Sequence, residues 1–474
     1  MKVLLVIPPS PFLADAKVMA SLGVLWVAAA LRAKHHEVQV LDLEGRRDWR
    51  DLTASAVEEN RPQAVGVTGT SAHWPFCVEI NRIVKQADPA IKTIAGGAHV
   101  SMGPELAKTA GFDVLVMDDG LSGICLALEA APGSIVKGPM TPTEIWPLPA
   151  RDLIAIKDYK YFLAGDENKL ATIMMATMGC PYQCFFCGGR EVEFYRRYRT
   201  RPVEQVISEL EHCEQEYGFK NFVFMDDEVN INKAWLVDLC AALVARGTPW
   251  GWRAFVKSNL FTDEQAAQMK AAGCIEVCTG VESGSDRILK TWIRKSTTYA
   301  INKQCVEIAR RNGLRIKCFC MIGNPGETLE DVHKTKEWIL DARPDSFDLT
   351  VFTPYPGSPI FNKLFHGLGR AEIPTNNMEN MPLEATLPNF EKESWFYKGV
   401  RGEYKTGTRT LGMNGEPGLS SAELVALRDQ IDEECKEALG HGDQASNRIS
   451  PLFTAQQVYE AGMGQTPVHK LAGP

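Results

Sequence analysis

Three cysteines stand close together at Cys180, Cys184 and Cys187, in a C-x3-C-x2-C spacing. They follow the strand-like run 171–175, so we expect them on a loop at the end of a strand. A structural zinc normally takes four ligands from two separated pairs. Three thiolates instead suit a [4Fe–4S] cluster, which keeps one iron open for another ligand. The spacing therefore predicts an iron–sulfur cluster, with zinc binding or plain core packing as the alternatives.

The other cysteines do not form such a group. The chain has 13 cysteines, an odd count, and no signal peptide is recognised at its start, so a disulfide framework is not expected. Several lie inside apolar segments, where we expect them to act as small buried hydrophobic residues. These are Cys240, Cys274, Cys278, Cys318 and Cys320.

The overall composition is that of a globular protein of about three domains. The 474 residues are 45% hydrophobic and 23% charged, which excludes disorder as the dominant state. The net charge of −8 argues against a general nucleic-acid binder. No apolar run approaches the roughly 18 residues of a membrane span. We therefore expect a cytoplasmic protein that binds neither nucleic acid nor membrane.

The first 130 residues alternate strand-like and helix-like segments. This alternation predicts an α/β fold with a Rossmann-like, doubly wound parallel sheet. Such sheets bind ligands at the carboxyl ends of their strands. Small and polar residues occupy these ends, which is equally consistent with a bound ligand and with ordinary short βα loops rich in Gly and Ser. No G-x-G-x-x-G opens the first helix, so a dinucleotide is not expected. The expected strands are 2–7, 37–43, 64–68, 92–95 and 113–117.

Four later strand-like runs also end in polar or glycine-rich turns. The run 222–225 ends in Asp226-Asp227-Glu228, and the run 276–280 ends in 281–285. The runs 315–322 and 347–352 end in the turns 323–328 and 353–359. Helical segments separate the four, so in a barrel their ends would face one cavity.

The cysteine loop and these turns resemble the radical S-adenosylmethionine (SAM) superfamily. The N-terminal unit resembles the cobalamin-binding domain of a class B methyltransferase-like subgroup, and the resemblance covers about residues 1–365. It implies a partial (β/α)6 barrel after the Rossmann-like sheet, then a mostly helical or irregular C-terminal extension. The implied domains are 1–135 (cobalamin-binding), 136–165 (linker), 166–365 (radical SAM core) and 366–474 (a closing region with a partly disordered tail).

The resemblance also implies residues that bind SAM. Asp226 or Asp227 would contact the methionine ammonium, Glu282 the ribose hydroxyls, and Lys257 the methionine carboxylate. The alternatives are carboxylates that start helices, a surface lysine and a plain turn. The full set is Phe186, Asp226, Asp227, Lys257, Glu282, Gly323 and Pro325.

Cobalamin would bind the strand ends of the N-terminal sheet. The D-x-H-x-x-G motif that supplies a cobalt-ligating histidine is absent, so we expect cobalt without that ligand. His99 matches the subgroup's loop and would hydrogen-bond the corrin or its tail, with a satisfied loop histidine as the alternative. The implied residues are Thr68, Thr70, Ser71, Gly96, Gly97, His99, Asp118 and Gly120.

The resemblance implies a cobalamin-dependent radical SAM methyltransferase with three cofactors: a [4Fe–4S] cluster, SAM and cobalamin. Its substrate would be a small biosynthetic intermediate, methylated at an unactivated carbon or a phosphinate phosphorus. An external one-electron reductant of the flavodoxin or ferredoxin type would be its partner. The first alternative keeps the cofactors but oxidises, cyclises or rearranges the substrate. The second is a non-catalytic iron–sulfur electron carrier or sensor.

Overall fold

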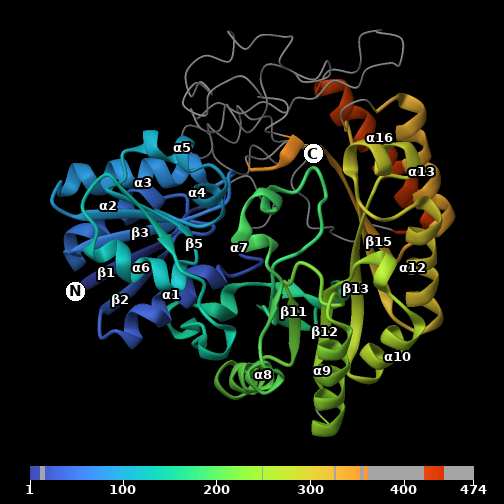
Figure 1. Ribbon diagram of the computed structural model, residues 1–474, viewed down its shortest axis with the longest axis horizontal. Coiled ribbons are helices and arrows are strands. Elements are labelled where there is room, and N and C mark those ends of the chain that lie inside the picture. The colour runs from blue at the N-terminus through green and yellow to red at the C-terminus, as the bar shows by residue number, and fades with distance from the viewer. Residues whose placement is uncertain (11–15, 248, 325–326, 353–356, 361–420, 442–474) are drawn as a thin grey trace.

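The structure is a computed structural model that describes residues 1–10, 16–247, 249–324, 327–352, 357–360 and 421–441. Two sheets organise these residues, an N-terminal sheet drawn in blue and cyan and a curved second sheet drawn in green to orange (Figure 1). The short helix α7 (Glu193–Arg196) lies between them in this view. Among the described helices, none has the length and apolarity needed to cross a membrane.

The N-terminal sheet has six parallel strands in the order β2-β1-β3-β4-β5-β6. The five expected strands are confirmed. A sixth strand, Ser134–Gly138, was not expected and crosses the implied boundary between residues 135 and 136. That strand is short and only half-buried, so it lacks the apolar run that marks the others. The strands are β1 (Lys2–Ile7), β2 (Glu37–Asp42), β3 (Ala64–Thr68), β4 (Lys92–Gly96), β5 (Val114–Asp118) and β6 (Ser134–Gly138).

Helices cover both faces of this sheet because its central strands are apolar on both sides. In β1, Leu4 and Val6 pack into one core cluster and Leu5 and Ile7 into the other. Helices α2 and α3 close the first face, while α1 and α6 close the second. The helices are α1 (Leu22–Ala33), α2 (Trp49–Asn60), α3 (Trp74–Ala87), α4 (Ala98–Met102), α5 (Pro104–Ala107) and α6 (Gly120–Glu129).

The second sheet is a partial barrel of six parallel strands in the order β15-β14-β13-β12-β11-β8, with β7 added antiparallel at the edge. This arrangement confirms the expected partial (β/α)6 barrel. Parallel order brings the carboxyl ends of all six strands to one rim. The strands are β7 (Tyr161–Phe162), β8 (Leu170–Met174), β11 (Asn221–Phe224), β12 (Gly251–Phe255), β13 (Cys274–Glu282), β14 (Arg315–Ile322) and β15 (Ser346–Val351).

Helices line the outside of the barrel, and a helix from the C-terminal region joins them. This helix is α16 (Ser421–Leu439), which packs on β15 and α13 through Leu424, Ile431 and Cys435. In Figure 1 it is the red helix beside α13. The remaining helices are α8 (Val203–Tyr217), α9 (Lys233–Arg246), α10 (Asp263–Ala271), α11 (Asp286–Ile288), α12 (Tyr299–Arg311) and α13 (Leu329–Ala342).

The segment between the two sheets is packed rather than free. Arg151 is fully buried and bonds to the Glu209 carboxylate at 2.6 Å, while Arg201 binds the other oxygen of Glu209 at 2.7 Å. The hydroxyl of Tyr159 donates to Asp42 of the first sheet at 3.0 Å. This segment therefore fixes the N-terminal sheet against the barrel.

Candidate cofactor sites

The cysteine loop starts from a backbone shape that requires glycine. Gly179 has φ +86, and a Cβ atom there would lie 2.3 Å from the carbonyl oxygen of Arg197. The next residue, Cys180, donates its backbone N–H to the Tyr195 carbonyl at 2.9 Å. The loop is thus held by the segment around α7.

The three cysteine side chains are free thiols that face a common charged region. Burial raises the pKa of Cys180 to about 12, and burial also raises the pKa of Cys184 although Lys295 and Lys257 oppose it. Across the described residues, no three His, Cys, Asp or Glu side chains are grouped as ligands of one ion. Thiols that bind separate corners of a cluster need not converge on one point, and two nearby cations suit its anionic ligands. The donor set fits the predicted cluster.

Asp226 and Asp227 hold the chain that enters this loop. An Asp226 oxygen accepts the N–H groups of Ala176, at 2.9 Å, and Thr177, and an Asp227 oxygen accepts that of Gly179 at 2.9 Å. Burial raises the pKa of Asp226 to about 7 against these hydrogen bonds. Both carboxylates therefore hold the backbone of residues 176–179, which leads into the cysteine loop.

Glu282 forms a buried ion pair that the sequence did not reveal. Its Oε1 lies 2.9 Å from Nζ of Lys295, which also donates to the Gly280 carbonyl at 2.6 Å. Burial opposes the charge of Lys295, but Glu282 and Glu228 raise its pKa above the usual range. Glu282 ends β13 with φ +67, a conformation that is rare outside glycine. Such strain commonly marks functional sites.

Lys257 is buried, so the surface-lysine alternative is wrong. It is 1% exposed, and its Nζ lies 4.0 Å from the ring centroid of Tyr182 in the cysteine loop. It stands two residues after the end of β12. Burial and the nearby Lys295 lower its pKa. Phe186 is partly buried in the same loop.

The turn after β14 is held by a carboxylate. Glu327 is fully buried, and one of its oxygens accepts the N–H groups of Gly323, at 2.5 Å, and Asn324, at 2.9 Å. Burial raises the pKa of Glu327 to about 8. Gly323 therefore lies in a turn whose backbone is held by the Glu327 carboxylate. Pro325 lies outside the described residues.

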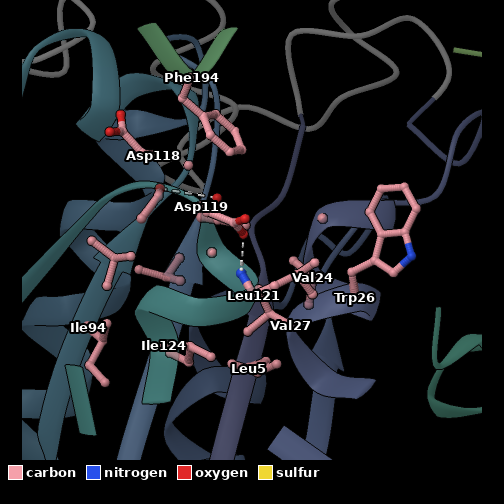
Figure 2. A pocket seen from close by; sticks show the side chains of 18 of the residues that line it. Leu5, Val24, Trp26, Val27, Ile94, Asp118, Asp119, Leu121, Ile124 and Phe194 are labelled. Atoms are coloured by element: carbon pink, nitrogen blue, oxygen red, sulfur yellow. Dashed lines mark hydrogen bonds between the residues drawn. The ribbon is translucent and has the colours of Figure 1, made fainter. Parts of the chain in front are cut away.

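A pocket of about 970 Å³, part of it open to solvent, lies at the carboxyl edge of the first sheet. Its deep wall is apolar and includes Leu5, Ile94 and Ile124, whereas Asp118 and Asp119 lie near its mouth (Figure 2). Five predicted cobalamin residues line it: Thr68, Gly96, Gly97, Asp118 and Gly120.

Glycines create this pocket. A Cβ atom on Gly97, which has φ +90, would lie 2.1 Å from Oγ1 of Thr68. One on Gly66 would lie 2.8 Å from a methyl group of Leu5. The cradle suits a flat, largely apolar group with a polar rim, as the corrin and its heterocyclic tail are.

Three of the predicted cobalamin residues are not part of this lining. His99 is fully buried, stacks on Trp74 with ring centroids 4.5 Å apart, and has Nδ1 3.1 Å from the Ser71 hydroxyl. Burial lowers the pKa of His99 to about 3. Thr70 lies instead in a separate hydrogen-bonded group with His73, at 2.8 Å.

The pocket also reaches the cysteine loop. Met178, Phe194 and Tyr195 line it from the barrel side, and Phe194 points into it in Figure 2. On the side of the first sheet, the hydroxyl of Ser101 in α4 accepts the backbone N–H of the pocket residue Asp118 at 2.9 Å. No sequence motif marked these residues, because their role depends on how the two units pack.

The chain matches two known families in this order. Residues 15–125 match the B12 binding domain, and residues 174–339 match the radical SAM superfamily. An uncharacterized methyltransferase of Pyrococcus horikoshii is 29% identical in an alignment 387 positions long, which covers 76% of this chain and 82% of the relative. The anaerobic magnesium-protoporphyrin IX monomethyl ester cyclase of Rubrivivax gelatinosus is 26% identical, over 66% of this chain and 61% of its own length.

A solved structure has the same fold. The radical S-adenosylmethionine methyltransferase TsrM from Kitasatospora setae, with cobalamin and a [4Fe–4S] cluster bound, superposes with a TM-score of 0.62 at 20% identity. The match covers 77% of this chain and 74% of TsrM. The chain thus has the B12-binding match followed by the radical SAM match, which is the domain content of a cobalamin-binding radical SAM enzyme. Its cofactors are those of its two matched domains, namely a [4Fe–4S] cluster, SAM and cobalamin.

Proposed function

We propose that the chain methylates a small molecule at an unactivated carbon or a phosphinate phosphorus. One observation carries this proposal: the pocket of the B12-binding unit is walled on one side by Met178 and Tyr195, which adjoin the cysteine loop. A methyl donor in that pocket and a radical source at the loop would therefore serve one substrate. The cofactors supply, when bound, a transferable methyl group and a primary carbon radical.

In this proposal residues 1–135 hold cobalamin, 136–165 link the units, 166–365 hold the cluster and SAM, and 366–474 help to enclose the substrate. Cys180, Cys184 and Cys187 ligate the cluster. Most of residues 366–474 lie outside the described part of the chain. The packed linker keeps the two sites in a fixed relation.

The charged groups around the cysteine loop would bind the polar ends of SAM. Lys257 and Lys295 place two buried cations beside Cys184, suited to a carboxylate. Asp226 and Asp227 offer acceptors for an ammonium group, and Glu282 offers one for ribose hydroxyls. Phe186, Gly323 and Pro325 would border the rest of the molecule.

The strand-end residues would hold cobalamin through shape more than charge. Thr68, Gly96, Gly97, Asp118 and Gly120 form the rim of the pocket. The apolar wall behind them would exclude water from the part of the cofactor held in the pocket. Ser71 and His99 support this rim from behind, since both are buried.

A relative that is named a cyclase makes a second reaction class worth testing. Cyclisation or oxidation uses the radical but not the methyl group. The experiment is an anaerobic assay with labelled SAM, candidate small molecules and a flavodoxin- or ferredoxin-type reductant. Methyl transfer to carbon predicts S-adenosylhomocysteine and 5′-deoxyadenosine in roughly equal amounts, together with a methylated product. With the true substrate, 5′-deoxyadenosine alone would establish the cyclase or oxidase class instead.

A further inference from the structure

Four side chains join in a line at the carboxyl ends of β1, β2 and β3. The hydroxyl of Ser10 donates to Oε1 of Glu44 at 2.8 Å. The same hydroxyl oxygen lies 2.8 Å from Nε2 of His73, and Nδ1 of His73 lies 2.8 Å from the hydroxyl of Thr70. Three loops distant in sequence thus supply one continuous chain of hydrogen bonds.

This series of hydrogen bonds runs from the interior of the protein to its surface. Ser10 is 1% exposed and Glu44 is 7% exposed, whereas Thr70 is exposed. The second carboxylate oxygen of Glu44 is buried and has no hydrogen-bond partner among the described residues. A carboxyl group in that position is costly to ionise and well placed to hold a proton.

The hydrogen bonds along these four side chains can all point in either of two opposite directions. With Glu44 ionised, Thr70 donates to Nδ1, the Nε2–H group donates to Ser10, and Ser10 donates to Glu44. With Glu44 protonated, Glu44 donates to Ser10, Ser10 donates to Nε2, and the Nδ1–H group donates to Thr70. Each link between the four side chains therefore has one donor and one acceptor in both states, and the neutral tautomer of His73 differs between them. The backbone N–H of Thr70, whose nitrogen lies 3.4 Å from Nδ1, has Nδ1 as an acceptor only in the state with Glu44 ionised.

We propose that Thr70, His73, Ser10 and Glu44 form a proton relay, which exchanges one proton between the buried Glu44 carboxyl and a polar ligand group docked at Thr70. The proposal rests on the proposed function, because Thr70 stands two residues after Thr68, which ends β3 and lines the proposed cobalamin pocket. A proton that arrives at the Thr70 oxygen displaces the Thr70 hydrogen onto Nδ1. The Nε2 hydrogen then moves to Ser10, and the Ser10 hydrogen moves to Glu44. One proton enters at Thr70 and one is stored on Glu44, while Thr70, His73 and Ser10 each gain one hydrogen and lose one.

The surrounding charges favour a change at Glu44 and not at His73. Burial raises the pKa of Glu44 to about 8, with Asp42 adding to the rise while the Ser10 hydrogen bond and Lys17 oppose it. Burial lowers the pKa of His73 to about 4. Tyr159, which faces the same carboxylates, has its pKa raised and stays neutral.

The test follows the tautomer of His73 in the cofactor-free chain by ¹⁵N NMR of labelled histidines. We expect the proton to move from Nδ1 to Nε2 as the pH rises through about 8. His73→Gln assigns the signal among the nine histidines. His99, which bonds to Ser71 outside the relay, is the internal control and keeps one tautomer.

Two variants interrupt the relay at different points. Ser10→Ala removes the link, and Glu44→Gln removes the titrating group, so each should leave His73 with one tautomer at all pH values tested. A fixed tautomer in the unmodified chain would overturn the proposal, as would a doubly protonated His73 near neutral pH or a switch that survives both substitutions. Cobalamin binding, followed separately by absorption, tests the proposed function and is independent of these outcomes.

Discussion

The carbonyl oxygen of Tyr195 accepts the backbone N–H of Cys180 at 2.9 Å, while the side chain of Tyr195 lines the pocket of the B12-binding unit. One residue therefore contacts both the cysteine loop and the proposed cobalamin site. A movement of the cysteine loop would therefore displace a residue that lines the pocket.

The cluster should depend on three cysteines. The triple variant Cys180→Ala, Cys184→Ala and Cys187→Ala should lose the four irons and four sulfides that a [4Fe–4S] cluster contains. Iron and sulfide analysis after anaerobic reconstitution, with the visible absorption spectrum, measures the loss. The matched control is the pair Cys318→Ala and Cys320→Ala, whose thiols are buried in the barrel core. A full cluster in the triple variant would rule out this assignment.

Gly179 should be required for cluster assembly. Gly179→Ala forces a Cβ atom to within 2.3 Å of the Arg197 carbonyl, so the loop must move and cluster content should fall severalfold. Gly218→Ala is the control, because Gly218 also has a positive φ, of +74, but has open space around its Cβ position. It should cost about 1 kcal/mol of stability and leave the iron content unchanged. Equal iron loss in both variants would mean that the close contact is not the cause.

The buried pair of Glu282 and Lys295 should control SAM affinity. Glu282→Ala removes an acceptor and leaves Lys295 with an unpaired charge, so binding should weaken by ~1.5–3 kcal/mol. Isothermal titration with SAM on the reconstituted protein gives the change. Lys303→Ala, which breaks the exposed pair with Asp341, should bind SAM as the unmodified chain does. Unchanged affinity in Glu282→Ala would remove this residue from the site.

Much of this arrangement was predictable from the sequence, and the exceptions share a cause. The strands of both sheets other than β6 follow from apolar runs, and the cysteine loop follows from its spacing. The sequence does not reveal the role of Lys295, because this residue follows a π-helical turn, Leu289–Ile293, and meets Glu282 only after the chain folds back. The role of Tyr195 is hidden for a similar reason, since it lines the pocket only once the N-terminal sheet and the barrel pack together.

The cobalt should not acquire a histidine ligand from this chain's predicted site. Both ring nitrogens of His73 are within 2.8 Å of hydroxyl groups, and His99 is fully buried against Trp74. Paramagnetic resonance of the Co(II) state should lack strong nitrogen coupling from histidine. His73→Ala and His99→Ala should leave that part of the spectrum unchanged. Coupling that disappears in either variant would instead identify a protein ligand.

The stability of the folded chain should depend on Glu44 in a defined pH range. Its folded pKa, about 8, lies above the ordinary value of 4.5, so the folded state holds a proton that the unfolded state releases earlier. The stabilisation is complete below about pH 4.5 and is lost as the pH rises through about 8. Denaturant unfolding at several pH values should show a flatter profile for Glu44→Gln. An unchanged slope in that variant would place the titration elsewhere.

The buried bonds of Arg151 limit how this chain could be recombined with its relatives. Arg151 belongs to the linker, yet its guanidinium reaches the carbonyl oxygen of Ile173 and the carboxylate of Glu209. A chimaera joined after Arg151, with another linker residue in its place, would leave Glu209 with half of its charge compensation in a dry interior. Loss of a buried partner typically costs about 3–5 kcal/mol. The workable crossover point therefore lies before the linker, so that the barrel is inherited together with the segment that precedes it.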